Sequence, residues 1–351
     1  MLWSSGIPTG PTSTGEGVLL LDPTDYSTET LFLGSIAFAR RVEFDFARRE
    51  AVVLDTTNDE VYQIGSDGSV IVVPIDPNLS ISLITTAEPD FYYGTNGGNG
   101  SPIWLISTSP GGPVLPVFEP DGVTPATISS NTTGRINSFY YHRPSNSLYY
   151  DRRIDIGEES VVKLTLSSSG DQVLASEESP IDVTPPTIGV EVKNISIGRN
   201  NNEIFYSLDV NNNGQWPRAF VLNTDTLVPT AYFESGFFRA AGTNTGVYSP
   251  DLDRALLYTQ DGFREYEFGD VDLVGDAADL VAVDYGVSDM ALVTLPCRAD
   301  TNGDGLASPA DFSAWVLSFN SAGVNCEQNG DCLCGPSDFS AWILNFNTGC
   351  Q

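Results

Sequence analysis

The sequence predicts a mainly β protein. We expect a six-bladed β-propeller over residues 17–295, with seven blades as the alternative, followed by a small α-helical module over residues 296–351. Residues 17–295 have almost no helical periodicity and show short β-rich runs between Asn, Asp, Gly, Ser and Pro. These runs recur in units spaced by roughly 50 residues. The C-terminal segment contains one apolar stretch of helical period, written twice.

Residues 1–16 are rich in Gly, Pro, Ser and Thr, and we expect them to form an extended arm. The first ten residues lack the basic start and the apolar stretch of a signal peptide. If the protein is secreted, we therefore expect its signal to be absent from this chain.

Four segments of the predicted propeller share a strand, a polar turn, a second strand and an aspartate. They are 42–55, 138–151, 194–209 and 246–261. A third strand follows each segment, at 61–64, 161–164, 219–222 and 263–268, and a fourth often follows, as at 69–73 and 228–233. A more divergent unit covers about residues 80–118. Units of four strands at this spacing are typical of propeller blades.

Strands from both ends of this region are expected to form one further blade. They are 18–21 and 30–33 from one end, and 280–283 and 291–295 from the other. A shared blade would close the ring and remove the open sheet edges. The alternative is a stacked pair of β-sandwiches, which the regular spacing of the turns and the lack of a dividing linker disfavour.

A loop before the first copy of the duplicated stretch has the composition of a calcium site. It runs from residue 300 to 311 and reads Asp-Thr-Asn-Gly-Asp-Gly-Leu-Ala-Ser-Pro-Ala-Asp. Calcium loops place oxygen ligands at positions 1, 3, 5, 7, 9 and 12, with a glycine at the sharp turn. The residues at these six positions are Asp300, Asn302, Asp304, Leu306 through its carbonyl, Ser308 and Asp311. Ser308 should also cap a helix that begins at Pro309. The alternative is an Asn-Gly/Asp-Gly turn without a metal.

The second copy matches this ligand pattern less well. Aligned on its last aspartate, its ligands are Glu327, Asn329, Asp331, the Leu333 carbonyl and Asp338. Cys332 replaces the turn glycine, so a loop held by a disulfide is the alternative to calcium. Both copies continue into an amphipathic helix, and we expect the two aromatic faces to pack together. These faces contain Phe312, Trp315, Val316 and Phe319 in one copy, and Phe339, Trp342, Ile343 and Phe346 in the other.

No helix is expected before either loop, because residues 291–296 read as a strand that ends in proline. A duplicated calcium loop with only an exiting helix resembles a dockerin, of the cysteine-bearing type found at the C-termini of some secreted bacterial proteins. The resemblance implies docking to a cohesin-like protein on a scaffold or cell surface. Dockerins select cohesins with a Ser/Thr-type pair just before the last loop aspartate, where this chain has Pro309-Ala310 and Pro336-Ser337. Docking to another surface component or to copies of itself is therefore equally open. The larger domain resembles six-bladed bacterial propellers in layout only.

The net charge is −30, from 16 Lys and Arg against 46 Asp and Glu. This balance argues against nucleic acid and anionic membranes as partners, because both require basic patches. No stretch of about 20 apolar residues predicts a membrane span.

All five cysteines lie in the C-terminal module, where disulfides would stabilise a small core outside the cell. Cys297 and Cys350 could join its ends, and Cys326 could pair with Cys332 or Cys334. The odd cysteine would be free or would link to another chain. A zinc cluster is disfavoured by the spacing and by the lack of a nearby histidine.

Little in the sequence indicates catalysis. The single histidine, His142, lies in a turn where we expect solvent exposure. Aspartates recur at matching blade positions, which indicates turn capping; they are Asp45, Asp55, Asp151, Asp209 and Asp261. We therefore expect a non-catalytic binding or structural platform. The alternatives are a carbohydrate-active enzyme, either a glycoside hydrolase or a lyase, and a self-assembling filament or matrix subunit. Four glycosylation sequons occur, at Asn78, Asn99, Asn131 and Asn194.

Overall fold

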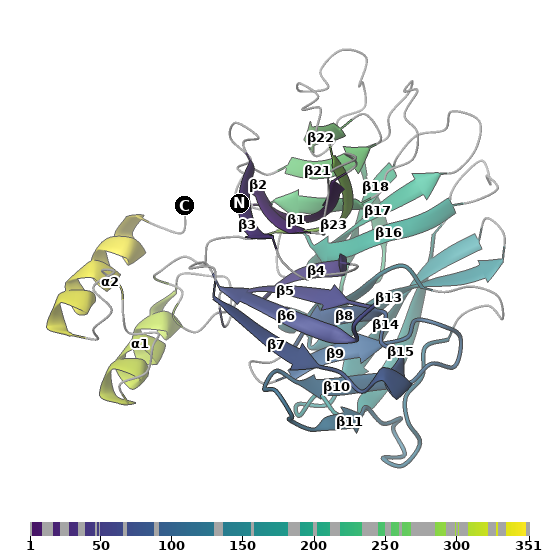
Figure 1. The fold of residues 1–351 in the computed structure, drawn as a ribbon, viewed down its shortest axis with the longest axis horizontal. Coiled ribbons are helices and arrows are strands. Elements are labelled where there is room, and N and C mark those ends of the chain that lie inside the picture. The colour runs from purple at the N-terminus through teal and green to yellow at the C-terminus, as the bar shows by residue number, and fades with distance from the viewer. Residues whose placement is uncertain are drawn as a thin grey trace. The chain divides into compact units, whose positions relative to one another are not determined.

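The computed structural model describes a β-rich unit and a pair of helices (Figure 1). It covers residues 2–8, 17–21, 28–33, 39–45, 48, 50–65, 69–87, 91–129, 136–155, 158–181, 190–198, 202–210, 218–233, 245–249, 254–259, 262–267, 285–292, 299, 301, 308–321, 328 and 335–348. For part of these residues, including all of those up to residue 40, it describes the backbone alone.

The chain divides into two compact units. The first contains Met1–Asp45 and Glu50–Leu292, and the second contains Val293–Gln351 with the short segment Phe46–Arg49. The sequence predicts a boundary after residue 295.

The described residues of the first unit form six antiparallel sheets, five with four strands and one with three. The first is β23 (Tyr285–Leu292), β1 (Leu2–Pro8), β2 (Gly17–Leu21) and β3 (Thr28–Leu33). The second is β4 (Ala39–Asp45), β5 (Glu50–Asp55), β6 (Glu60–Gly65) and β7 (Val70–Pro74). The third is β8 (Leu83–Thr86), β9 (Phe91–Thr95), β10 (Ile103–Ser107) and β11 (Val114–Pro116).

The remaining sheets follow in chain order. The fourth is β12 (Phe139–His142), β13 (Ser147–Asp155), β14 (Glu158–Leu166) and β15 (Val173–Ile181). The fifth is β16 (Val190–Ile197), β17 (Glu203–Val210), β18 (Arg218–Asn223) and β19 (Pro229–Phe233). The sixth is β20 (Thr245–Ser249), β21 (Arg254–Thr259) and β22 (Gly262–Glu267); residues 268–284, which follow β22, lie outside the described residues. Two short 3-10 helices, η1 (Pro77–Leu79) and η2 (Arg143–Ser145), lie in turns.

One edge strand of each sheet contacts an edge strand of the next sheet; these edge strands are β23, β4, β8, β12, β16 and β20. These contacts join β4 to β8, β8 to β12, β12 to β16, β16 to β20, β20 to β23 and β23 to β4. Side chains reinforce them: the Tyr141 amide donates to Thr85 Oγ1 at 3.1 Å, and the Ile195 amide donates to Ser138 Oγ at 2.7 Å. This propeller-like arrangement agrees with the predicted fold class.

The two ends of the unit meet in one sheet, as predicted. β2 and β3 match the predicted strands 18–21 and 30–33, whereas β1 and most of β23 were not predicted. β1 pairs with β2 on one side and with β23 on the other, so Leu2–Pro8 is a strand and the predicted N-terminal arm is wrong for these residues. Pairing on both sides satisfies the backbone groups of a segment whose side chains predict no strand. The predicted strand at 280–283 and residues 293–295 lie outside the described residues.

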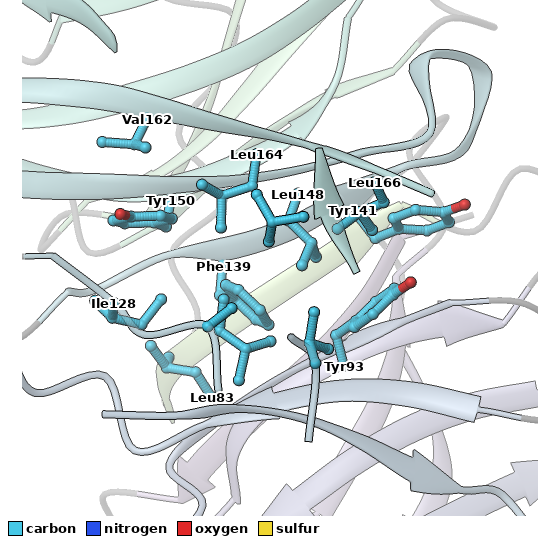
Figure 2. Packing of buried hydrophobic residues seen from close by; sticks show 14 of the residues in the cluster. Leu83, Tyr93, Ile128, Phe139, Tyr141, Leu148, Tyr150, Val162, Leu164 and Leu166 are labelled. Atoms are coloured by element: carbon cyan, nitrogen blue, oxygen red, sulfur yellow. The ribbon is translucent and has the colours of Figure 1, made fainter. Parts of the chain in front are cut away.

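Neighbouring sheets pack through apolar faces. Figure 2 shows the cluster between the β8–β11 and β12–β15 sheets, where Leu83 and Tyr93 face Phe139, Tyr141 and Leu148. The rings of Tyr93 and Tyr141 lie 5.3 Å apart, centroid to centroid. Tyr93 also donates its hydroxyl hydrogen to the Gly170 carbonyl at 2.9 Å, so its polar end is satisfied at the edge of the cluster.

The second unit contains α1 (Pro309–Ser321) and α2 (Pro336–Thr348). Both helices begin at the proline of the repeated segment. The helix start predicted at Pro309 is confirmed.

Leu148 and Leu174 test the packing between the sheets. Leu148 is fully buried in the cluster of Figure 2, whereas Leu174, on the outer strand β15 of the same sheet, is 54% exposed. Leu148→Ala should lower the free energy of unfolding by about 2–5 kcal/mol, because a cavity remains where the side chain was. Leu174→Ala should change it by less than about 0.5 kcal/mol in the same urea titrations. Equal losses in the two variants would contradict this packing.

Candidate metal-binding module and buried polar groups

Each helix of the C-terminal unit begins with the same hydrogen-bonded cap. The Ser308 amide donates to Asp311 Oδ2 at 2.7 Å, and the Gly335 amide donates to Asp338 Oδ2 at 2.7 Å. Ser308 Oγ accepts from the Ala310 amide at 3.2 Å, as expected of an N-cap residue. A carboxylate in the first turn also interacts favourably with the positive end of the helix dipole.

Asp311 and Asp338 are both fully buried. A buried carboxylate is costly unless hydrogen bonds or a cation compensate its charge. Asp338 uses its second oxygen as well, because Oδ1 accepts from the Gln328 amide at 2.7 Å. This bond joins the second and last positions of the second predicted loop, so this carboxylate is oriented toward its own loop.

The two helices pack through their aromatic faces in a twofold-related pattern, as predicted. Phe312 lies 5.5 Å from Trp342, and Trp315 lies 5.3 Å from Phe339, measured between ring centroids. Phe312 and Phe339 are 5.8 Å apart. Each tryptophan also stacks on the phenylalanine four residues later in its own helix, at 5.1 Å in both copies.

One loop-to-helix contact was not predicted from the sequence. The indole nitrogen of Trp342 donates to the Ala299 carbonyl and to Thr301 Oγ1, both at 3.1 Å. Ala299 and Thr301 are buried and lie on either side of Asp300, the first predicted ligand. The pattern of a duplicated amphipathic helix indicates that Trp342 is buried, but it does not show where its N–H group points.

The corresponding position in the second loop is also attached to α2. Gln328, which aligns with Thr301, is buried, and its Oε1 accepts from Asn345 Nδ2 at 3.1 Å. The second positions of both loops are therefore tied to the same helix.

Of the eleven predicted metal ligands, Ser308, Asp311 and Asp338 are described. The other eight lie outside the described residues: Asp300, Asn302, Asp304, Leu306, Glu327, Asn329, Asp331 and Leu333. The same holds for Cys297, Cys326, Cys332, Cys334 and Cys350. Within the described part of the chain, no group of three or more His, Cys, Asp or Glu side chains could hold a metal ion. The buried acids at the helix starts, together with an all-oxygen donor set in the sequence, fit a hard cation.

In the propeller-like unit, His142 is fully buried, and the prediction of solvent exposure is wrong. It caps η2: Nδ1 accepts from the Ser145 amide at 3.3 Å and lies 2.8 Å from Ser145 Oγ. Its ring meets Tyr149 edge-on at 6.1 Å. Burial, with a smaller contribution from the Lys163 charge, lowers the pKa of His142 to about 4. The imidazole is therefore neutral over most of the physiological range.

The repeated aspartates do not all cap turns. Asp55 does, because its Oδ1 accepts from the Thr57 amide at 2.9 Å. Asp151 instead holds the chain just before β12: its Oδ1 accepts from the amides of Asn137 and Ser138 at 2.8 and 2.6 Å. Burial raises the pKa of Asp151 to about 7, although these amides and the Arg41 guanidinium oppose the rise.

Three of the four sequons lie among the described residues, and Asn131 lies outside them. Asn99 is exposed between β9 and β10. Asn78 is exposed in η1. Asn194 is buried, and its Nδ2 donates to the Gly246 carbonyl at 3.0 Å, so glycosylation there would remove a contact between two sheets.

No protein-family model and no curated protein matches the chain. Its fold is similar to a chain in the crystal structure of a nidogen/laminin complex, with a TM-score of 0.52, 10% identity, and coverage of 83% of this chain and 98% of that one. A Bacteroides uniformis protein with a provisional 6-phosphogluconolactonase assignment gives a TM-score of 0.48 at 10% identity, covering 81% of this chain and 82% of its own. Regucalcin, a calcium-binding protein from Agrobacterium tumefaciens, gives 0.43 at 12% identity, covering 75% and 77%. At identities this low, the similarity indicates the fold alone. In the described part of the chain, no helix is long and apolar enough to cross a membrane.

His142→Asn tests the effect of the buried imidazole. Asn can still cap η2 but does not titrate. Because the pKa of His142 is about 4 in the folded protein and 6.5 for a histidine exposed to water, the unfolded chain binds more protons between these values. Its contribution to stability is thus present above pH 6.5 and is lost toward pH 4. The variant should flatten the pH dependence there, by up to about 1.4 kcal/mol per pH unit, in urea unfolding at stepped pH. An unchanged slope would contradict the assignment.

Asp151→Asn should change the pH dependence of the free energy of unfolding in the opposite direction from His142→Asn. The folded state retains the Asp151 proton to a pKa of about 7, whereas the ordinary value for an aspartate is 3.8, so this group lowers stability as pH rises between the two. Asn keeps a carbonyl acceptor for the Asn137 and Ser138 amides. The variant should therefore gain stability relative to the parent as pH rises from 4 to 7, by up to about 1.4 kcal/mol per unit. A slope that moves in the same direction as that of His142→Asn would rule out this interpretation.

Proposed function

We propose that this protein is a secreted, non-catalytic β-propeller that binds or organises other molecules. It is attached to a cell surface, scaffold or extracellular assembly through its helical module, which calcium orders. The observation that carries the proposal is the pair of buried carboxylates, Asp311 and Asp338, each ending an Asp- and Asn-rich loop at the start of a helix. The dockerin-like sequence pattern supports the same attachment role.

The charge of the first loop favours a divalent ion. Asp300, Asp304 and Asp311 place three carboxylates within one short loop of a chain whose net charge is −30. Like charges held this close repel one another, and burial of Asp311 increases the cost. A calcium ion bound by these oxygens offsets both effects and stabilises the helix pair that follows.

We further propose that the six sheets are the blades of one closed ring. The cycle of contacts between their first strands supports this number, and so does the sheet shared by the two ends of the unit. Closure by strands from both ends leaves no unpaired inner strand in such a ring.

Three polar side chains that could be considered for catalysis are enclosed by the fold. His142 is enclosed, and its Nδ1 is engaged by Ser145. The carboxylates of Asp55 and Asp151 accept backbone N–H groups. None of these three side chains is available to a substrate, as a general acid or base would have to be.

The helices also present apolar side chains outward. Leu317 and Leu344, at equivalent positions of the two copies, are 70% and 64% exposed. Exposed leucines on a small helical module suit a contact surface for a partner protein.

Calorimetry on the full chain tests the calcium site. After chelator treatment, calcium should bind with measurable heat, and Asp304→Ala should remove the binding attributed to the first loop, because loss of one carboxylate leaves the ion underliganded. The matched control is Asp171→Ala, an exposed aspartate between β14 and β15, which should bind calcium as the parent does. The absence of heat from the parent would overturn the proposal.

The attachment role needs a second measurement on the same material. The calcium-loaded chain should be retained on immobilised cohesin modules or should sediment as a larger species, and chelation should reverse either effect. A monomeric chain that binds none of the cohesin modules but releases reducing sugar from polysaccharide would favour the carbohydrate-active enzyme instead.

A further inference from the structure

We infer that Trp342 is a positioning residue that couples the first calcium loop to the packing of the two helices. The inference rests on the proposed calcium binding and adds a coupling route to it. Trp342 belongs to the second copy, yet its indole N–H reaches the loop of the first copy.

The contact fixes the chain on both sides of the first ligand. The Trp342 nitrogen donates to the carbonyl of Ala299 and to the hydroxyl of Thr301, the two residues that flank Asp300. Thr301 Oγ1 in turn donates to the Ala299 carbonyl at 3.3 Å. Holding Ala299 and Thr301 in place reduces the ordering that calcium would otherwise have to impose.

The same indole ring is part of the helix interface. It packs 5.5 Å from Phe312 of α1 and stacks 5.1 Å from Phe346 of α2. Movement of α2 relative to α1 therefore moves the hydrogen-bond donor that holds the loop. If the loop loses its order, a buried N–H group loses both acceptors, which is unfavourable.

Linkage makes this coupling reciprocal. If helix packing raises the affinity of the loop for calcium, calcium must stabilise the helix packing by the same factor. Among the described residues, the indole N–H of Trp342 donates to the first loop alone, and Gln328 of the second loop accepts from Asn345. The effect of Trp342 should therefore be specific to the first loop.

The duplicated module supplies its own control. Trp315 occupies the equivalent position on α1 and is buried to the same degree as Trp342. Trp342→Phe and Trp315→Phe remove the same atoms from the aromatic core, and each leaves a ring in place. Only the first removes the described donor to Ala299 and Thr301. Thr301→Val deletes one acceptor while leaving the helix interface untouched.

The experiment uses the full chain carrying Asp331→Ala, which disables the second predicted site. Calcium alone is titrated into chelator-treated protein by calorimetry, and near-ultraviolet circular dichroism of the tryptophans reports helix packing. Trp342→Phe should weaken calcium binding by about 3- to 10-fold, as expected for a lost buried hydrogen bond. Trp315→Phe should stay within about 2-fold of the parent, and Thr301→Val should weaken binding by about 2- to 5-fold. The calcium-induced dichroism change should shrink in Trp342→Phe.

The outcomes separate this inference from the function on which it rests. Absence of heat from the Asp331→Ala parent overturns the calcium site and the coupling together. Normal binding by the parent with unchanged affinity in Trp342→Phe, or equal losses in the two tryptophan variants, overturns the coupling alone. If Trp342→Phe does not fold, Thr301→Val decides, and parent-like affinity in that variant overturns the coupling.

Discussion

The propeller-like unit depends on the pairing of strands from its two ends. β1 lies between β2 and β23, so the last strand of the unit completes the sheet that the first one begins. Bringing these ends together has an entropic cost that grows slowly with the length of chain between them. Each other sheet is built from consecutive strands and needs only local turns. Among the described sheets, the pairing of β1 with β23 is therefore the long-range one, and it lies in the same unit as the cycle of contacts between sheets.

The helical unit has a different constraint, which is the small size of its core. Two helices of 13 residues cannot enclose a large core, so their stability depends on aromatic side chains that interdigitate across a twofold axis. Because the segment is repeated, both helices carry the same pattern of aromatic side chains, and the two faces therefore match. The copies differ where the loops meet α2, because Thr301 is held by a tryptophan and Gln328 by an asparagine.

Local patterns predicted much of the fold. Alternating apolar runs located most strands, and the repeated helices with their aromatic faces were predicted with their correct starts. β1 was missed because Ser, Gly and Pro give Leu2–Pro8 no strand signature, and only its pairing with distant β23 makes it one. His142 was misjudged because it is the last residue of β12 and packs edge-on against Tyr149 of β13, which the polar composition of the turn does not show. The bond from Trp342 to Ala299 spans 43 positions of the chain and that from Ser138 to Asp151 spans 13, and no spacing rule identifies either.

The position of β23 has a mechanical consequence. The second unit resumes at Val293, directly after β23 ends at Leu292, so tension carried by the chain beyond Val293 reaches the propeller-like unit through this strand. Bonds between antiparallel strands run perpendicular to the strands. A pull along β23 therefore loads all of the hydrogen bonds between β23 and β1 together, instead of breaking them one after another.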